Sequence, residues 1–165
     1  MISHRMLEKV ECVFRNEDII RSVSSLLSKG FEVVVAIDAP LTTARDGKGF
    51  RQVDRELLKM GYRVLPLSFV GMAKLTKRAI ELSKTLRALG VRVVETHPRS
   101  ALRSSGCESV EQLVRALGIE GEISYSNRDL LDSIVCAVVA LCLDNGCAYE
   151  VRASDGSIWL LKRLC

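Results

Sequence analysis

The stretch VVVAIDAP, residues 33–40, decides the predicted fold of this chain. An unbroken apolar run rich in β-branched residues predicts a strand that is buried on both faces, as in the centre of a parallel sheet. Asp38 then lies at the carboxyl end of this strand. Because open α/β sheets bind ligands beyond the carboxyl ends of their strands, Asp38 is a candidate functional residue. The alternative interpretation is that its side chain stabilises the turn that contains Pro40.

A second acidic residue ends a second predicted strand, in the stretch VRVVETHP at residues 91–98. Glu95 follows the apolar part of this run, and Pro98 stops it. Carboxyl ends of neighbouring parallel strands meet at one edge of a sheet. We therefore expect Asp38 and Glu95 to be neighbours.

A third acidic group opens the most hydrophobic predicted helix, at residues 126–143. Asp129 and Asp132 occupy neighbouring positions on its first turns. Ser126 and Asp129 have the spacing of a capping box, so Asp129 is interpreted as a cap or as a ligand. Asp132 lies deeper, where capping does not explain it and where a buried carboxylate needs a partner. Much of the helix is apolar on every face, which predicts packing against a sheet.

The remaining segments alternate between strands and helices. The pattern predicts a half-exposed strand at residues 10–14, helices near 17–29, 51–60, 72–89 and 109–117, loops at 42–49 and 99–106, and a terminal hairpin with strands at 149–152 and 158–161. This alternation predicts an α/β fold with a mostly parallel sheet flanked by helices, in a single domain over residues 1–165.

Composition limits the class of protein. The chain has 165 residues and a net charge of +4, with 24 basic and 20 acidic residues spread along it, which permits binding to polyanions without indicating it. The chain opens without a signal-peptide pattern, and the apolar part of the last long helix, flanked by Asp132 and Asp144, is too short to span a bilayer. We expect a cytoplasmic protein that does not associate with a membrane.

Six cysteines are scattered along the chain without CxxC spacing, and only two histidines accompany them. Cys136 and Cys142 fall inside the buried helix, so we expect small buried apolar residues rather than a disulfide framework or a zinc site. Few Asn and Gln residues with abundant Arg, Glu and Val are typical of a thermophile, in which cytosolic disulfides do occur. No pairing is predicted.

Carboxylates that converge at one end of a sheet predict a site for a hard divalent cation. Mg²⁺ or Mn²⁺ prefers carboxylate oxygens, and a pair of such ions clamps the attacking and departing oxygens of a phosphodiester. The expected ligands are Asp38, Glu95 and Asp132.

Basic residues that follow the Asp38 loop are candidate phosphate contacts. These are Arg51, Arg55, Lys74 and Lys77. The alternative is that they form a solvated helix face, as basic residues on amphipathic helices commonly do. His97 is a candidate for proton transfer, with packing or capping as the alternative.

Four motifs in order also carry a resemblance: VAIDAPL at residues 35–41, GFRQVDREL at 49–57, ETHP at 95–98 and LDS at 131–133. The chain resembles the family called domain of unknown function 429 over nearly its whole length from about residue 10. That family is regarded as a predicted nuclease with a ribonuclease H-like fold, related to Holliday-junction resolvases. The resemblance implies that Asp38 is the later-strand metal ligand and that Asp129 and Asp132 are the helix ligands.

The chain departs from this family at its start. Members usually begin with a strand that bears a glycine and an aspartate and that pairs with a second strand, and residues before Leu7 do not match it. Three explanations are open: the start is assigned too far downstream, the chain is truncated, or the natural protein lacks the first metal ligand. We therefore expect an N-terminally short domain, with Glu8, Glu11 and Glu95 as conceivable substitute ligands. An unpaired sheet edge is normally covered or paired, which suggests a homodimer through that edge.

Two functions remain open. The first is a metal-dependent nuclease that hydrolyses phosphodiesters in nucleic acid. The second is a catalytically inactive ribonuclease H-like domain that binds nucleic acid, a nucleotide or a protein. The retained acids favour the first function, and the missing first strand favours the second.

Overall fold

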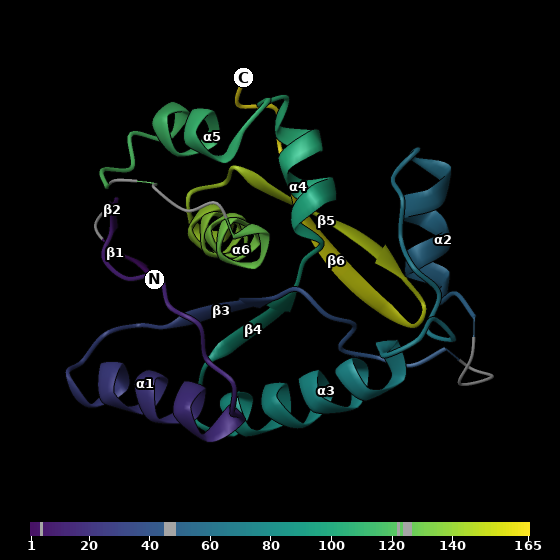
Figure 1. Ribbon diagram of the computed structural model, residues 1–165, viewed down its shortest axis with the longest axis horizontal. Helices are drawn as coiled ribbons and strands as arrows, with labels where there is room; N and C mark the ends of the chain where they lie inside the picture. The colour runs from purple at the N-terminus through teal and green to yellow at the C-terminus, as the bar shows by residue number, and fades with distance from the viewer. Residues whose placement is uncertain (4, 45–48, 122, 124–126) are drawn as a thin grey trace.

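The computed structural model describes residues 1–3, 5–44, 49–121, 123 and 127–165. In this part of the chain it contains six helices and three small sheets, which confirms a mixed α/β fold (Figure 1). The helices are α1 (Asn16–Ser28), α2 (Gln52–Lys59), α3 (Met72–Ala88), α4 (Pro98–Ser105), α5 (Val110–Ala116) and α6 (Arg128–Asp144). The strands are β1 (Ile2–Ser3), β2 (Met6–Leu7), β3 (Val34–Ile37), β4 (Arg92–Glu95), β5 (Ala148–Ala153) and β6 (Gly156–Leu161).

Strands β3 and β4 are parallel and in a register that places Ile37 opposite Glu95. Asp38 therefore follows β3 at the level where β4 ends, as the sequence predicts. The hairpin β5–β6 comes alongside β4, because Thr96 bridges to Trp159 and donates its hydroxyl hydrogen bond to the Trp159 carbonyl over 2.8 Å. The ladders β1–β2 and β5–β6 are antiparallel, and a mostly parallel ribonuclease H-like sheet stays a prediction.

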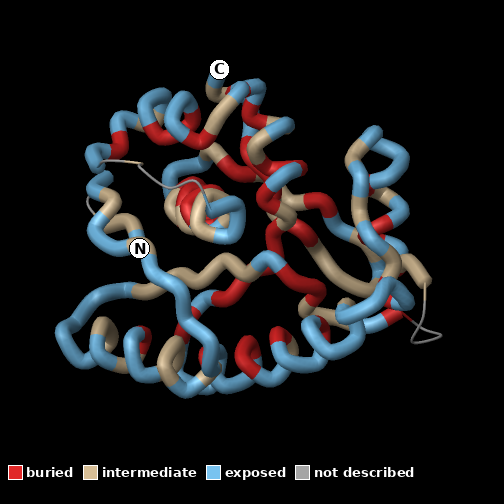
Figure 2. Tube along the Cα trace, viewed as in Figure 1, coloured by how far each residue is buried: buried red, intermediate tan, exposed pale blue. Residues whose placement is uncertain are grey.

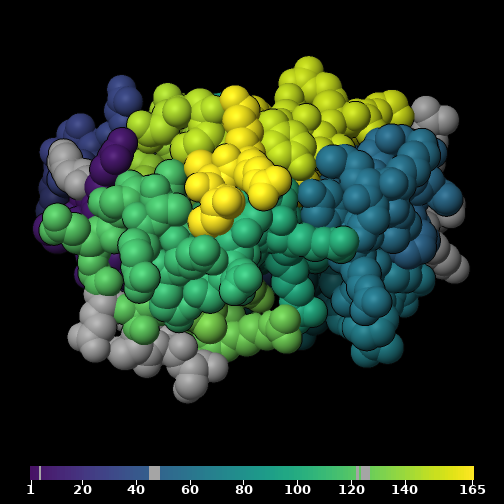
Figure 3. Space-filling model, turned by 90° about the horizontal axis from the view of Figure 1, so that it is seen from above, coloured from purple at the N-terminus to yellow at the C-terminus, as the bar shows by residue number. Residues whose placement is uncertain are grey.

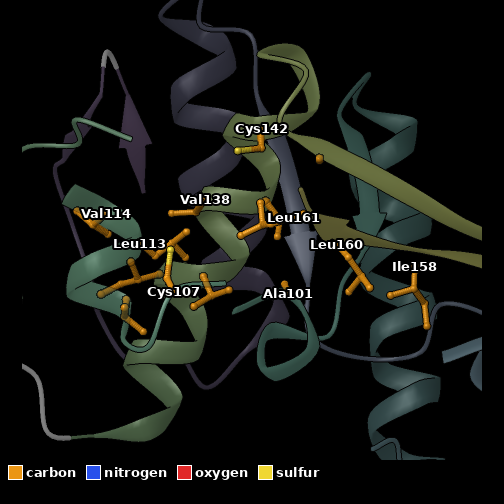
Figure 4. Close-up of a cluster of buried hydrophobic side chains, with 14 of the residues drawn as sticks. Ala101, Cys107, Leu113, Val114, Val138, Cys142, Ile158, Leu160 and Leu161 are labelled. Carbon is orange, nitrogen blue, oxygen red and sulfur yellow. The ribbon is translucent and has the colours of Figure 1, made fainter. Parts of the chain in front are cut away.

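Helices cover the two faces of the β3–β4 sheet. Figure 1 shows α1 and α3 on one side and α6 on the other. On the α1–α3 side the buried residues are Val23, Leu82, Leu86, Val91 and Val93. On the other side a larger core joins α6 to α4, α5 and the β5–β6 hairpin (Figure 4). The buried inner face of α6 is clear in Figure 2, and it confirms the predicted packing of that helix.

Strand β3 is less buried than its apolar sequence predicts. All four of its residues are half-buried, whereas Val93, Val94 and Glu95 of β4 are buried. Among the described residues β3 pairs with β4 alone, so its other edge has no ladder partner. The missing neighbour on that edge accounts for the exposure.

Two predicted elements are wrong. Residues 10–14 form no strand, and Phe14 is 83% exposed, because nothing in the described chain pairs with this segment. Residues 98–105 form helix α4 where a loop was expected. Pro98 opens this helix and Gly106 ends it with a φ of 78°, which is the ordinary pattern of proline at the start and glycine just past the end of a helix.

The expectation of unpaired cysteines is also wrong for four of them. Cys107 pairs with Cys165 and Cys142 with Cys147, while Cys136 is free and buried as expected. The first pair forms because the C-terminal residues lie against the end of α4, where the Ser105 carbonyl accepts hydrogen bonds from the backbone of residues 164 and 165 (Figure 3). The second pair closes the turn after α6.

No helix in the described ranges is both long and apolar enough to cross a membrane.

Candidate functional site

A cavity of about 610 Å³ lies where the parallel strands end. Asp38 follows β3, residues 95–97 end β4 and lead into α4, and Asp129 and Asp132 come from the first turns of α6. Residues 62–65 and the start of α3 also line the cavity. The fold therefore brings four predicted acidic site residues, Asp38, Glu95, Asp129 and Asp132, to the lining of one cavity.

Asp38 lies at the opening of this cavity, where its side chain reaches solvent. Removal of water by the cavity walls, and then the negative charge of Asp132, raise the pKa of Asp38 to about 6. The positive charge of Arg99 opposes this rise. The charge of Asp38 is thus close enough to those of other carboxylates to be affected by them.

Asp132 is half-buried one turn inside α6. Desolvation raises its pKa, and the charges of Arg99 and Arg128 act in the opposite direction. Asp129 is exposed, and its backbone amide donates a 2.8 Å hydrogen bond to the Asn127 side chain, which caps the helix. Ser126, the first residue of the predicted capping box, lies outside the described residues.

Glu95 is buried and its carboxylate is already occupied. Its Oε2 accepts hydrogen bonds of 2.8 Å from the Leu41 amide and from the Arg51 guanidinium, and its Oε1 accepts a second bond from Arg51. Burial raises the pKa of Glu95, whereas the ion pair with Arg51 lowers it. Glu95 therefore fixes the backbone just after Asp38 and presents no free oxygen to the cavity.

Arg51 is the centre of a buried ion cluster. Only 1% of it is exposed, and it binds Asp54 as well as Glu95. The Arg51 backbone amide and side chain both donate to Asp54, three residues ahead at the start of α2. The alternative that places Arg51 on a solvated helix face is wrong, because Arg51 is buried and two buried carboxylates require its charge. Its contact with a phosphate stays a prediction.

The other predicted basic residues lie away from the cavity. Arg55 is exposed on α2, and Lys74 and Lys77 are exposed on α3. Neither these three nor the suggested substitutes Glu8 and Glu11 belong to the described lining of the cavity. Glu8 accepts a hydrogen bond from the Ser3 hydroxyl, and Glu11 pairs with Lys9 over 2.8 Å.

Arg99 is a site residue that the sequence analysis missed. It is exposed in the first turn of α4, and its charge acts on Asp38, Asp132 and His97. The ring of His97 shares a 2.7 Å hydrogen bond with the Ser100 hydroxyl, and burial followed by the charge of Arg99 lowers its pKa. The segment was expected to be a loop, so Arg99 was not placed near the acids.

The cavity acids have the chemistry of ligands for a hard cation. Among the described residues no group of three or more His, Cys, Asp or Glu side chains is arranged to hold a metal ion. Mg²⁺, however, is commonly held by one or two carboxylates, with water and substrate phosphate completing its shell. Asp38 and Asp132 offer such a pair of oxygen donors.

A scan of protein-family models, a search of curated proteins and a search of solved structures each found no match to this chain.

Proposed function

We propose that this chain is a metal-dependent nuclease of ribonuclease H-like fold, related to the domain of unknown function 429 family. The observation that carries the proposal is that Asp38, Asp129 and Asp132 come from two elements to one cavity beside Arg99. The mutual repulsion of Asp38 and Asp132 supports it, because a divalent cation between them would remove the cost of holding like charges together.

The residues have distinct roles in this proposal. Asp38 and Asp132 hold Mg²⁺ or Mn²⁺, and Asp129 binds water at the exposed rim. The cation supplies a more acidic water and neutralises charge on the phosphate. Arg99 binds a non-bridging phosphate oxygen. The water oxygen bonds to phosphorus and one phosphorus–oxygen ester bond breaks. One proton of that water is transferred to the departing oxygen, which leaves a phosphomonoester and an alcohol.

Mn²⁺ titration by calorimetry tests the metal site directly. We expect the parent chain to bind Mn²⁺ and both Asp38→Asn and Asp132→Asn to lose most of that binding. Asp144→Asn, at the exposed far end of α6, is the matched control and should bind as the parent does. Absence of Mn²⁺ binding in the parent at millimolar concentration would refute the nuclease proposal.

A second candidate function is a catalytically inactive domain that binds nucleic acid. It is favoured by Glu95, which is one of the three expected metal ligands. Both oxygens of its carboxylate already accept hydrogen bonds from Arg51 or the backbone, so Glu95 is engaged in the fold rather than with a metal. We would assay single- and double-stranded DNA and RNA for both binding and cleavage with Mn²⁺ present. Binding without cleavage would select this second function.

A homodimer through the free edge of β3 remains part of the proposal. A second cavity, of about 960 Å³, runs along this strand and is lined also by α1 and α6. Pairing of two β3 edges would cover it and complete the open ladder. Light scattering coupled to size-exclusion chromatography should then give twice the chain mass, and a monomer at all concentrations would contradict the dimer.

A further inference from the structure

The lining of the 610 Å³ cavity contains arginine, aromatic and apolar residues besides the acids. Arg63 and Arg103 belong to it together with Tyr62, and the apolar residues are Val64, Leu65, Met72 and Leu75. Leu65 and Leu75 are 52% and 41% exposed. The cavity lining therefore combines acidic, basic and apolar residues.

Arg103 is held in a defined position. Its guanidinium donates a 2.9 Å hydrogen bond to the Gly61 carbonyl and lies 5.7 Å from the centre of the Tyr62 ring. The Tyr62 backbone is itself fixed to the end of α2 by a 3.0 Å bond to the Leu57 carbonyl. An arginine stacked on an aromatic ring in this way is already oriented before a ligand arrives.

Arg99 and Arg103 are four residues apart on α4, so they lie on the same face of that helix. Both line the cavity, as does Arg63. Three exposed arginines thus border one half-open cavity. Guanidinium groups bind phosphate oxygens through paired hydrogen bonds, which makes such a group of arginines suited to a phosphate.

The volume limits the size of the ligand. About 610 Å³ is within the range of pockets that enclose one small organic molecule. A nucleotide matches the chemistry of this wall, because its phosphate suits the arginines and its base suits a tyrosine and exposed apolar side chains. A nucleotide inside a continuous duplex is paired and stacked, so it would have to leave the base stack to enter the cavity.

We propose that Arg63, Arg99, Arg103 and Tyr62 form a subsite for one nucleotide at the end of a single strand. This inference rests on the proposed nuclease function for the statement that the bound nucleotide belongs to a strand that is cleaved. Binding of the nucleotide to the subsite does not depend on the metal. The substrate class that follows is a free strand end with a phosphate, rather than the interior of a double helix.

Binding of adenosine 5′-monophosphate in EDTA tests the subsite without any metal. We expect saturable binding by the parent chain, measured by calorimetry, and about tenfold or greater weakening in Arg63→Gln and in Arg103→Gln. Arg63→Gln keeps the test valid if loss of the Arg103 contact to Gly61 disturbs folding. Arg115→Gln, on the exposed surface of α5, is the control and should bind like the parent. Adenosine without phosphate should bind at least tenfold more weakly than the monophosphate.

Cleavage of linear and circular single strands of the same sequence, with Mn²⁺ present, separates the two proposals. Faster cleavage of the linear strand, with the difference lost in Arg63→Gln, supports the subsite. Equal cleavage of both strands, or no binding of the monophosphate, overturns the subsite and leaves the nuclease proposal intact. Binding of the monophosphate without Mn²⁺ binding or cleavage supports the subsite and overturns the nuclease.

Discussion

Replacing Arg51 by methionine should strongly destabilise the fold. The guanidinium is 1% exposed and neutralises Asp54 and Glu95, which are 4% and 5% exposed. Methionine is apolar and cannot neutralise either acid, so the variant leaves two buried carboxylates with no positive partner from residue 51. Breaking a buried ion pair from one side costs about 3–5 kcal/mol. That is a large part of the roughly 5–15 kcal/mol by which ordinary domains are stable.

The assay is urea unfolding of the parent, Arg51→Met, Arg51→Lys and Arg55→Met at pH 7 and pH 5. Lysine keeps the charge but cannot bind both carboxylates with a planar fork, so we expect a smaller loss than for methionine. Arg55→Met removes an exposed arginine of the same helix and should change the free energy of unfolding by at most about 0.5 kcal/mol.

The pH dependence gives a second readout of the same idea. Without Arg51, only the backbone hydrogen bond from Leu41 still opposes desolvation at Glu95, so the folded-state pKa of Glu95 rises further above the ordinary value of 4.5. When folding raises the pKa of an acid, its charged form destabilises the folded state at pH values above the unfolded-state pKa. Protonation of the acid removes this destabilisation as the pH falls. The deficit of Arg51→Met should therefore shrink from pH 7 to pH 5. An Arg51→Met loss as small as that of Arg55→Met, or equal at both pH values, would refute the reasoning.

Two further predictions concern Asp38 and the disulfides. Because the folded pKa of Asp38 is about 6 against an ordinary 3.8, its charge costs stability above pH 6 and costs nothing below pH 3.8. Asp38→Asn should thus raise the free energy of unfolding at pH 7 by about 1 kcal/mol, a value that allows for solvent screening. Near pH 3.5 the variant and the parent should be equally stable. A lower melting temperature of the variant at pH 7 would contradict this prediction. The Cys107–Cys165 bond spans 58 residues and the Cys142–Cys147 bond spans 5, so loop-closure entropy predicts stabilisation of about 4 and about 2 kcal/mol. Cys165→Ser should therefore lower the melting temperature more than Cys147→Ser, and the reverse order would show that strain or local contacts outweigh chain entropy.

Local sequence patterns determined most of the elements. Apolar runs predicted β3 and β4, amphipathic spacing predicted α3, and a turn-forming cluster at residues 154–157 predicted the hairpin. These patterns reflect side chains and backbone within a few residues of one another, so they are visible in the sequence. For the same reason Asp38 and Glu95 could be placed at like ends of two strands. The helix at Pro98 could also have been predicted from its proline and glycine signals.

Only the tertiary structure decided what those acids contact. Glu95 is neutralised by Arg51, 44 residues earlier in the chain, and Cys165 meets Cys107, 58 residues away. The same long-range packing faces Arg99 toward Asp38 and Asp132, and leaves residues 10–14 without a strand partner. A buried charge takes whichever partner the fold brings to it, and a strand exists only where a second edge is available. Neither partner is specified by neighbouring residues, so the sequence determined where the acids lie and the packing determined which of them remain free for chemistry.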